Sequence, residues 1–456
     1  MGNQTLEELR ERAYGAVVLP GDAEYDEARA VYNAMIDRRP AAVVRCANAG
    51  DVVATVGFAR ESGMPLAIRG GSHSAPGFGT VDDGIVADLS GLRSVRVDPA
   101  ARTARVDGGA TLADLNAATC AFGLGVTGGI ISTTGVAGLT LGGGMGYLAR
   151  KLGLTCDNLL SADVVTADGR FLTVDESHHP DLFWALRGGG GNFGVVTSFE
   201  FRLSPVGDVY AGPMLFELEH AEAVLRWYRD YIRTAPEEFY VFPAFQIAPP
   251  LPFISEDRHG DPFILLVACW SGPPEEGERA VAPCREAAPV AFEHVGPMPY
   301  PALVSAFDGL LPPGLQQYWK GSYATDLTDD AIAAHLEHGP NVPNLHSTCH
   351  IYPVDGAVQR VAPDATAYAY RDAAFATVIV GVGPDPAGNE SRTAWVRRYY
   401  DAVSAHSSPG GYVNFIGEDD QDKVTANYRG NYDRLVEVKR AWDPGNLFRV
   451  NHNIAP

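Results

Sequence analysis

The chain has 456 residues, more than one hydrophobic core usually organises, so we expect two closely packed domains. Hydrophobic residues make up 46% and charged residues 20%, as in an ordinary soluble globular protein. The formal net charge of −21 repels phosphate backbones and anionic lipid headgroups, which argues against nucleic acids and membranes as partners.

The cysteines and the N-terminus exclude further classes of protein. The 6 cysteines show neither a C-x-x-C pair nor the spacing of a zinc site, so we expect reduced, mostly buried thiols and no metal. The first residues lack the apolar core of a secretory signal, and no segment is apolar over a membrane-spanning length. We therefore expect a cytoplasmic protein, whose oligomeric state the sequence does not reveal.

Short elements alternate in the first part of the chain. Roughly the first forty residues favour short helices, and a helix is expected to start at Asp51. Strands are predicted at 41–45, 84–89, 95–98 and 103–107. Residues 163–173 predict a β-hairpin with its turn at Asp168-Gly169.

Glycine-rich segments interrupt this region. Arg69-Gly70-Gly71-Ser72-His73-Ser74 follows an apolar strand, and its glycines let the backbone approach a diphosphate while Arg69 adds positive charge. Further glycine runs lie at 128–146 and 188–194. Glycine-rich backbone at separated places favours a long, flat ligand lying against the main chain.

Beyond Pro205 the glycine runs stop and longer strands are expected. Strands are predicted at 209–218, 239–248, 263–270, 346–353 and 375–382, and helices at 221–234 and 392–405. Strands of this kind under helices favour an antiparallel α+β domain.

Five motifs occur along the chain in a fixed order. They are R-G-G-S-H-S at 69–74, the run from Gly142 to Asn158, D-L-F-W-A-L-R-G from Asp181, Y-V-N at 412–414 and D-P-G-N-L-F from Asp443. With them the chain resembles the flavin-linked oxidases of the vanillyl-alcohol oxidase superfamily, in the berberine-bridge-enzyme-like branch. The resemblance implies an α+β fold with a two-part FAD-binding domain of the PCMH type, residues 1–205 and a C-terminal return at 410–456. An inserted antiparallel-sheet substrate domain would occupy 206–409.

The resemblance also implies how FAD is held. In this family the histidine of the first motif bonds covalently to the flavin, a role that falls on His73, and a neutral imidazole can make such a bond. Many members add a bond through a cysteine, but residues 129–135 contain none, which implies a single attachment and leaves Cys156 as a packing residue. The cofactor-binding residues implied are Arg69, Gly70, Gly71, Ser72, His73, Ser74, Ser132, Thr133, Thr134, Gly138, Gly142, Gly143, Gly146, Asn192, Val196, Tyr412, Asn414 and Asn451.

Tyr412 and Asn414 are the first candidates for catalysis. In the family the tyrosine faces the flavin and often removes the substrate's proton. If the segment is a strand, its period of two places both side chains on one face. A tyrosine of ordinary pKa is a poor base at neutral pH, so a nearby donor or cation is expected, and the candidates are His350, Tyr352, Lys320 and Arg371.

Residues of the second domain could line a substrate pocket. His346, His350 and Tyr352 lie at even spacing along one predicted strand, and we discount a metal because no carboxylate has comparable spacing. Tyr240 and Trp319 are possible aromatic walls, although packing in the core is the alternative for each.

The function expected is hydride transfer from a C–O or C–N centre of a small molecule to covalent FAD, with O2 as the terminal acceptor. Thr134 occupies a position that borders the family's oxygen pocket, with Leu139 expected beside it. A hydrogen bond from its hydroxyl near flavin N5 is compatible with an oxygenating enzyme of the flavin-N5-oxide type. The alternative is that the same hydroxyl caps the loop. The sequence is also compatible with a dehydrogenase of the same fold and with a non-catalytic flavoprotein.

Overall fold

A four-stranded sheet begins the fold in this computed structural model, which describes residues 5–417, 419 and 423–456. Its strands lie in the order β1 (Val17–Val18), β2 (Ala42–Arg45), β4 (Ile85–Asp88) and β3 (Leu66–Arg69), with α1 (Leu6–Arg12) and α2 (Tyr25–Arg29) beside them. The Asn48 side chain caps α3 (Ala49–Ser62), so this helix begins two residues before the expected Asp51. Strand β1 interrupts the helices predicted for the first forty residues.

A five-stranded antiparallel sheet follows. It has the order β5 (Val95–Asp98), β6 (Thr103–Asp107), β10 (Val195–Arg202), β8 (Leu159–Val165) and β9 (Phe171–Val174). The predicted hairpin is confirmed as β8 and β9, and Gly169 in its turn has a φ of +85°. Around this sheet are α4 (Leu112–Cys120), α5 (Val136–Leu141), α6 (Ala149–Leu152), α7 (Pro180–Leu186) and the pair β7 (Leu124–Gly125) and β11 (Ser204–Pro205).

A large antiparallel sheet takes up the region after residue 208. Its path is β15 (Val290–Glu293), β12 (Val209–Phe216), β14 (Pro262–Trp270), β13 (Phe239–Ile247), β18 (Thr348–Pro353), β19 (Phe375–Gly383) and β17 (Gln316–Ala324), and β16 (Gly296–Met298) pairs with β12. The region also contains α8 (Ala221–Ile232), α9 (Gly277–Val281), α10 (Tyr300–Ser305), α11 (Asp329–His338) and α12 (Asn389–Ser404). The expected antiparallel α+β fold is confirmed.

Both faces of the large sheet are buried. Helices α8, α11 and α12 cover one face, against Phe216, Ile264 and Ile379. The alternate residues, among them Leu215, Leu265 and Val380, belong to the core that the sheet shares with the N-terminal part of the chain. Burial on both sides explains why β13, β14 and β19 are nearly continuous apolar runs.

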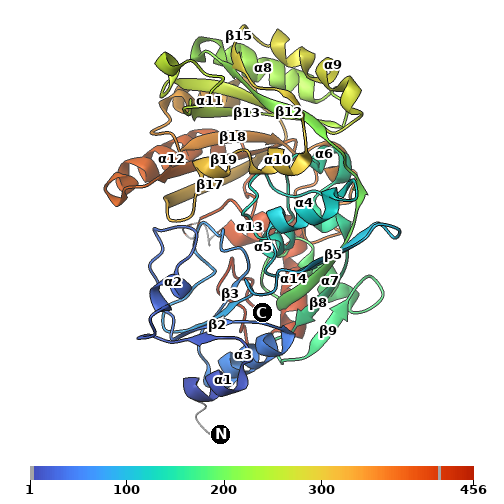
Figure 1. Cartoon of the computed structure of the whole chain (residues 1–456), viewed down its shortest axis with the longest axis vertical. Helices are drawn as coiled ribbons and strands as arrows, with labels where there is room; N and C mark the ends of the chain where they lie inside the picture. Colours follow the sequence, from blue (N-terminus) through green and yellow to red (C-terminus); the bar gives the residue numbers. More distant parts are fainter. Residues whose placement is uncertain (1–4, 418, 420–422) are drawn as a thin grey trace.

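The C-terminal segment lies with the N-terminal half of the molecule. Helices α13 (Val424–Tyr428) and α14 (Tyr432–Trp442), red in Figure 1, lie among the teal and blue elements, and α14 packs on α7. Lys439 donates to Asp443 at 2.7 Å and to the carbonyl of Asn192 at 2.8 Å, and the Asp443 carboxylate accepts the Phe448 N–H at 2.9 Å. The D-P-G-N-L-F motif therefore fastens the end of the chain to the glycine run at 188–194.

Across the described part of the chain, no helix combines the length and apolarity needed to cross a bilayer.

Candidate active site

A cavity of about 710 Å³ lies between the large sheet and the glycine-rich loops, a size typical of sites for small organic ligands. One part is lined by the loops around His73, Thr134 and Asn192 and by the C-terminal residues 450–452. The other part is lined by the sheet. We call this second part the sheet wall: Leu215, Phe242, Gln246, Leu265, Val267, Thr348, His350, Tyr352, Val378 and Val380.

Two of the loops touch backbone to backbone. A Cβ on Gly71 would lie 2.3 Å from the Gly135 nitrogen, and a Cβ on Gly135 would lie equally close to the Gly71 nitrogen, so any side chain at either position would force the loops apart. The next residue, Ser72, has a φ of +65°, uncommon for a residue other than glycine. Its buried hydroxyl has no hydrogen-bond partner among the described residues.

His73 lines the cavity as a neutral ring. Its Nε2 lies 2.8 Å from the Thr133 hydroxyl, and the imidazole stacks on Tyr32 with ring centroids 3.7 Å apart. Burial lowers the pKa of His73 to about 4. At neutral pH one ring nitrogen therefore keeps a lone pair, as nucleophilic attachment requires.

Arg69 does not supply the free charge expected of it. Its guanidinium donates to the carbonyls of Gly79 at 3.0 Å and Ala28 at 2.5 Å, and lies 3.6 Å from the Asp88 carboxylate. The Arg69 side chain is buried, which is possible because these carbonyls and the Asp88 carboxylate compensate its positive charge. Arg69 borders the cavity, but its charge serves the fold.

Four of the residues predicted to bind the cofactor do not line the cavity themselves but contact residues nearby. Ser132 is bound through its N–H and hydroxyl to the Asp308 carboxylate, at 2.9 and 2.5 Å, and Thr133 contacts His73. Gly142 leaves room for the Asn414 amide and Gly143 lies against Tyr368. The residues that line the cavity directly are Arg69, Gly70, Gly71, Ser72, His73, Ser74, Thr134, Gly138, Gly146, Asn192, Val196, Tyr412, Asn414 and Asn451, and Leu139 lies with them.

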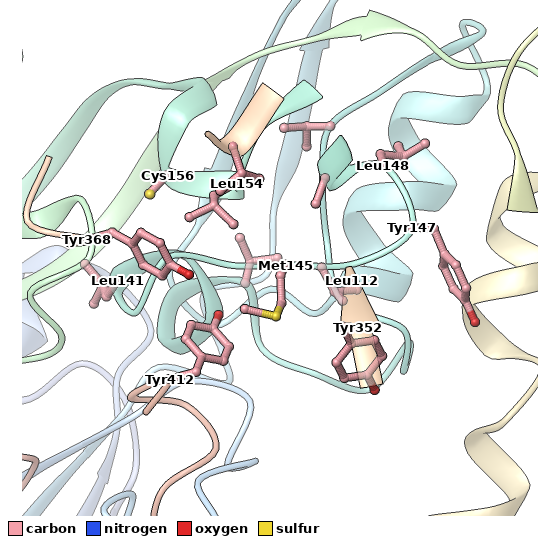
Figure 2. Close-up of a cluster of buried hydrophobic side chains, with 14 of the residues drawn as sticks. Leu112, Leu141, Met145, Tyr147, Leu148, Leu154, Cys156, Tyr352, Tyr368 and Tyr412 are labelled. Carbon is pink, nitrogen blue, oxygen red and sulfur yellow. The ribbon is translucent and has the colours of Figure 1, made fainter. Parts of the chain in front are cut away.

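Tyr412 and Asn414 lie in a turn, and not in the strand whose period of two would have placed both side chains on one face. The Phe415 N–H closes the turn on the Tyr412 carbonyl at 2.8 Å. The two side chains still meet, because Asn414 donates to the Tyr412 oxygen at 2.9 Å and to the Leu139 carbonyl at 3.2 Å. Figure 2 draws the Tyr412 hydroxyl pointing at the glycine-rich chain, where the Gly144 N–H donates to it at 2.8 Å.

The surroundings of Tyr412 act on its proton in opposite directions. Burial is the stronger influence and raises the pKa of the Tyr412 phenol well above its ordinary value, while the bonds from Gly144 and Asn414 offset part of this rise. Since both partners are donors, the phenolic proton points elsewhere. The four expected activators are engaged in other contacts: His350 with Tyr352, Lys320 with Asp419, and Arg371 with Asp157.

The sheet wall brings together the residues predicted for a substrate pocket. His350 and Tyr352 share one face of β18, with the His350 Nδ1 2.5 Å from the Tyr352 hydroxyl, and burial lowers the pKa of His350 to about 3. His346 precedes the strand and also lines the cavity, its Nδ1 2.7 Å from the Leu310 carbonyl.

The two predicted aromatic walls differ. Trp319 lines the cavity. Tyr240 is instead fully buried against Tyr147 and Phe242, with ring centroids 6.0 and 6.2 Å away.

In the view of Figure 2, Met145 lies between the rings of Tyr412 and Tyr352. Cys156 is buried beside Leu154, as expected of a packing residue.

Sequence reasoning missed three contributors to the site. Tyr32 stacks on His73, Asp308 holds the Ser132 loop, and the Gly144 N–H binds a hydroxyl 268 residues away. A backbone N–H carries no signal in a sequence, and the other two contacts depend on the tertiary fold.

Known proteins resemble this chain over nearly its full length. The family described as FAD binding domain matches residues 40–175, and that described as berberine and berberine like matches residues 411–455. The uncharacterized FAD-linked oxidoreductase YgaK of Bacillus subtilis is 32% identical, with 97% of each chain covered. (R)-6-hydroxynicotine oxidase of Paenarthrobacter nicotinovorans is 29% identical, also with 97% of each covered. Among solved structures, 6-hydroxy-D-nicotine oxidase from Arthrobacter nicotinovorans has a TM-score of 0.88 at 26% identity, covering 99% of this chain and 100% of that one.

Proposed function

Since the chain belongs to the berberine-bridge-enzyme-like family of FAD-linked oxidoreductases, we propose that it oxidises a C–O or C–N centre of a small organic substrate, with FAD bonded to His73 and O2 as the terminal acceptor. The observation that carries the proposal is that His73 and Tyr412, from opposite ends of the chain, line one cavity. A neutral imidazole suits covalent attachment, and a phenol held by two donors suits proton transfer.

The loop side of the cavity fits a large, flat, anionic cofactor. The contact of Gly71 with Gly135 brings two main chains together, the Ser72 hydroxyl lacks a protein partner among the described residues, and a Cβ on Gly138 would meet no atom within 4 Å. His73, the loop glycines, Asn192 and Asn451 would hold FAD there. When bound, FAD supplies the acceptor for a hydride and can pass its electrons to O2.

Tyr412, in its phenolate form, would take the proton that leaves the substrate's hydroxyl or amine and so become a neutral phenol. The Gly144 N–H and the Asn414 amide stabilise the negative charge on the phenolic oxygen before that transfer. Asn414 is anchored by the Leu139 carbonyl, which orients its amide so that nitrogen faces Tyr412. Burial of Tyr412 excludes water from the transfer.

The colour of the flavin, and its response to substrate and to air, test the proposal. We expect acid-precipitated protein to stay yellow, a substrate to bleach it without air, and air to restore the colour with release of hydrogen peroxide. Bleaching that air reverses only slowly would indicate a dehydrogenase, and ¹⁸O from labelled O2 in the product would indicate an oxygenating enzyme. A flavin that no substrate bleaches would leave a non-catalytic flavoprotein.

The organisation proposed with this function is the division into 1–205, 206–409 and 410–456. It is supported by the large sheet, whose strands all lie between Val209 and Gly383, and by α14, which packs on α7. A cytoplasmic location stays a prediction of the sequence.

A further inference from the structure

The cavity lining is almost free of charge. Among the described residues that line it there is no aspartate, glutamate or lysine, and the guanidinium of Arg69 is already compensated by Asp88 and by backbone carbonyls. A buried ion needs a partner of opposite charge, because its desolvation is otherwise uncompensated.

The polar groups of the sheet wall are largely bonded within the protein. Gln246 donates to the Leu345 carbonyl at 2.5 Å, and Thr348 donates to the Phe245 carbonyl at 2.9 Å. His350 and Tyr352 are bonded to each other. Few donors and acceptors therefore remain for a ligand with many hydroxyl groups.

Aromatic rings surround the approach to Tyr412. Phe415 meets Tyr412 edge to face with ring centroids 4.8 Å apart. Phe242 lies 4.9 Å from Tyr352 and 5.1 Å from His350, measured between centroids. Rings in these orientations offer flat surfaces and edges on which another ring packs well.

Apolar residues also line the cavity beyond the sheet. They come from two segments between strands, 248–254 and 306–311. Leu251 in the first of these is 40% exposed, which few large apolar side chains are among the residues that the structure describes.

From these observations we infer that the sheet wall takes an uncharged, flat, largely apolar molecule, an aromatic or polycyclic alcohol, as the substrate that Tyr412 deprotonates. The inference rests on the proposed function, which assigns the loop side of the cavity to FAD and leaves the sheet wall to the substrate. A cationic amine would lack a carboxylate there. An oligosaccharide would bury hydroxyl groups without hydrogen-bond partners, which disfavours its binding.

A matched series of ligands tests the inference on the purified holoenzyme. The probes are para-phenylbenzyl alcohol, para-phenylbenzylamine and para-phenylbenzoate, which share one ring system, and cellobiose. Binding is followed by the flavin spectrum and, independently, by tryptophan fluorescence. We expect the alcohol to bind about 10²-fold more tightly than the two ions and cellobiose. Equal or tighter binding of an ion or of cellobiose would overturn the inference.

A pair of glutamine variants locates the binding. Gln246→Glu places a carboxylate in the sheet wall, and we expect it to tighten binding of para-phenylbenzylamine by about tenfold or more and to weaken that of the alcohol. Gln316→Glu is the control, since Gln316 is equally buried at 8% but bonds to Asn389 outside the cavity lining. If neither variant changes the order of affinities, the ligands bind elsewhere and the inference fails; the wild-type series decides the matter if Gln246→Glu does not fold.

The two proposals can fail separately. Anaerobic bleaching by cellobiose or by the amine but not by the alcohol would overturn the substrate class and leave the oxidoreductase intact. Protein without flavin would overturn the proposed function, while the fluorescence titration would still report which probe the sheet wall binds.

Discussion

The His73 ring makes only a few contacts of its own, with the Thr133 hydroxyl and the Tyr32 ring, so its removal should not disturb the fold. We expect His73→Ala to stay folded and to release its flavin into the supernatant on acid precipitation, because the covalent bond is lost. Intact mass and the absorbance of the supernatant measure this. His178→Ala, at an exposed histidine paired with Asp175, is the control. A flavin adduct on any other residue of the wild type would contradict the assignment.

Tyr412 is tested by removing one oxygen atom. We expect Tyr412→Phe to slow flavin reduction by about 10²-fold or more, the size typical of losing a general base, with the flavin still bound. Stopped-flow reduction without air gives the rate. Tyr368→Phe serves as the control, because the Tyr368 phenol is buried and bonds to Tyr323 instead of lining the cavity. An unchanged rate in Tyr412→Phe would make Tyr412 a packing residue.

Single residues of the site were predictable where a motif carries them. His73, Tyr412 and Asn414 stand in such motifs, and all three line the cavity. What holds Tyr412 was not predictable, because its donors are a backbone N–H and the neighbouring Asn414, and all four side chains proposed for the task have other partners. The compensation of the Arg69 charge was not predictable, because a sequence does not show which carbonyls surround a guanidinium.

Strands buried on both faces were the elements easiest to predict. Strands β13, β14 and β19 lie within a few residues of their expected bounds, because double-sided burial leaves a continuous apolar run. Strand β17 was missed, since Gln316–Ala324 mixes glutamine, lysine and serine with aromatic residues. The turn at Tyr412 was not predictable, because the sequence showed only that a strand there would place Tyr412 and Asn414 on one face.

The C-terminal helix α14 depends on a buried ion pair. Asp443→Asn would leave the Lys439 ammonium, which is 0% exposed, without its counter-charge, and we expect a loss of about 3–5 kcal/mol in the free energy of unfolding. Urea unfolding measures the loss. Asp433→Asn removes an exposed carboxylate from the first turn of the same helix and should change little. Equal stability of the two variants would show that the ion pair does not hold the helix.

The stability of the whole molecule should depend on pH through buried histidine. Burial lowers the pKa of His335, which contacts Tyr399 at 2.8 Å, to about 3. The unfolded chain takes up this proton below about pH 6.5 while the folded protein does not, so folding stability falls as the pH falls from there towards 3. Between pH 6.5 and 5 we expect wild type to lose about 2 kcal/mol more than His335→Gln. Urea unfolding at the two pH values checks this, with His178→Gln as a control that should behave as wild type.

At the scale of the molecule, the α+β architecture with its antiparallel sheet was predictable from the family resemblance. It was also indicated after Pro205, where the glycine runs stop and longer apolar segments begin. The uncharged sheet wall was not. Its residues come from β12, β13, β14, β18 and β19, and only the strand order brings them to one surface. A sequence shows which residues alternate along a strand, but not which strands become neighbours.

The contacts of Ser132 with Asp308 and of Asn33 with Gln317 imply an order of assembly. Each joins residues that leave the ribosome far apart, since 176 and 284 positions separate the partners. At about 5–20 residues per second, the Ser132 loop waits roughly 10 to 35 seconds for Asp308 to be synthesised. We therefore expect the side of the cavity that faces the later half of the chain to close last, after Asp308 and Gln317 have been synthesised.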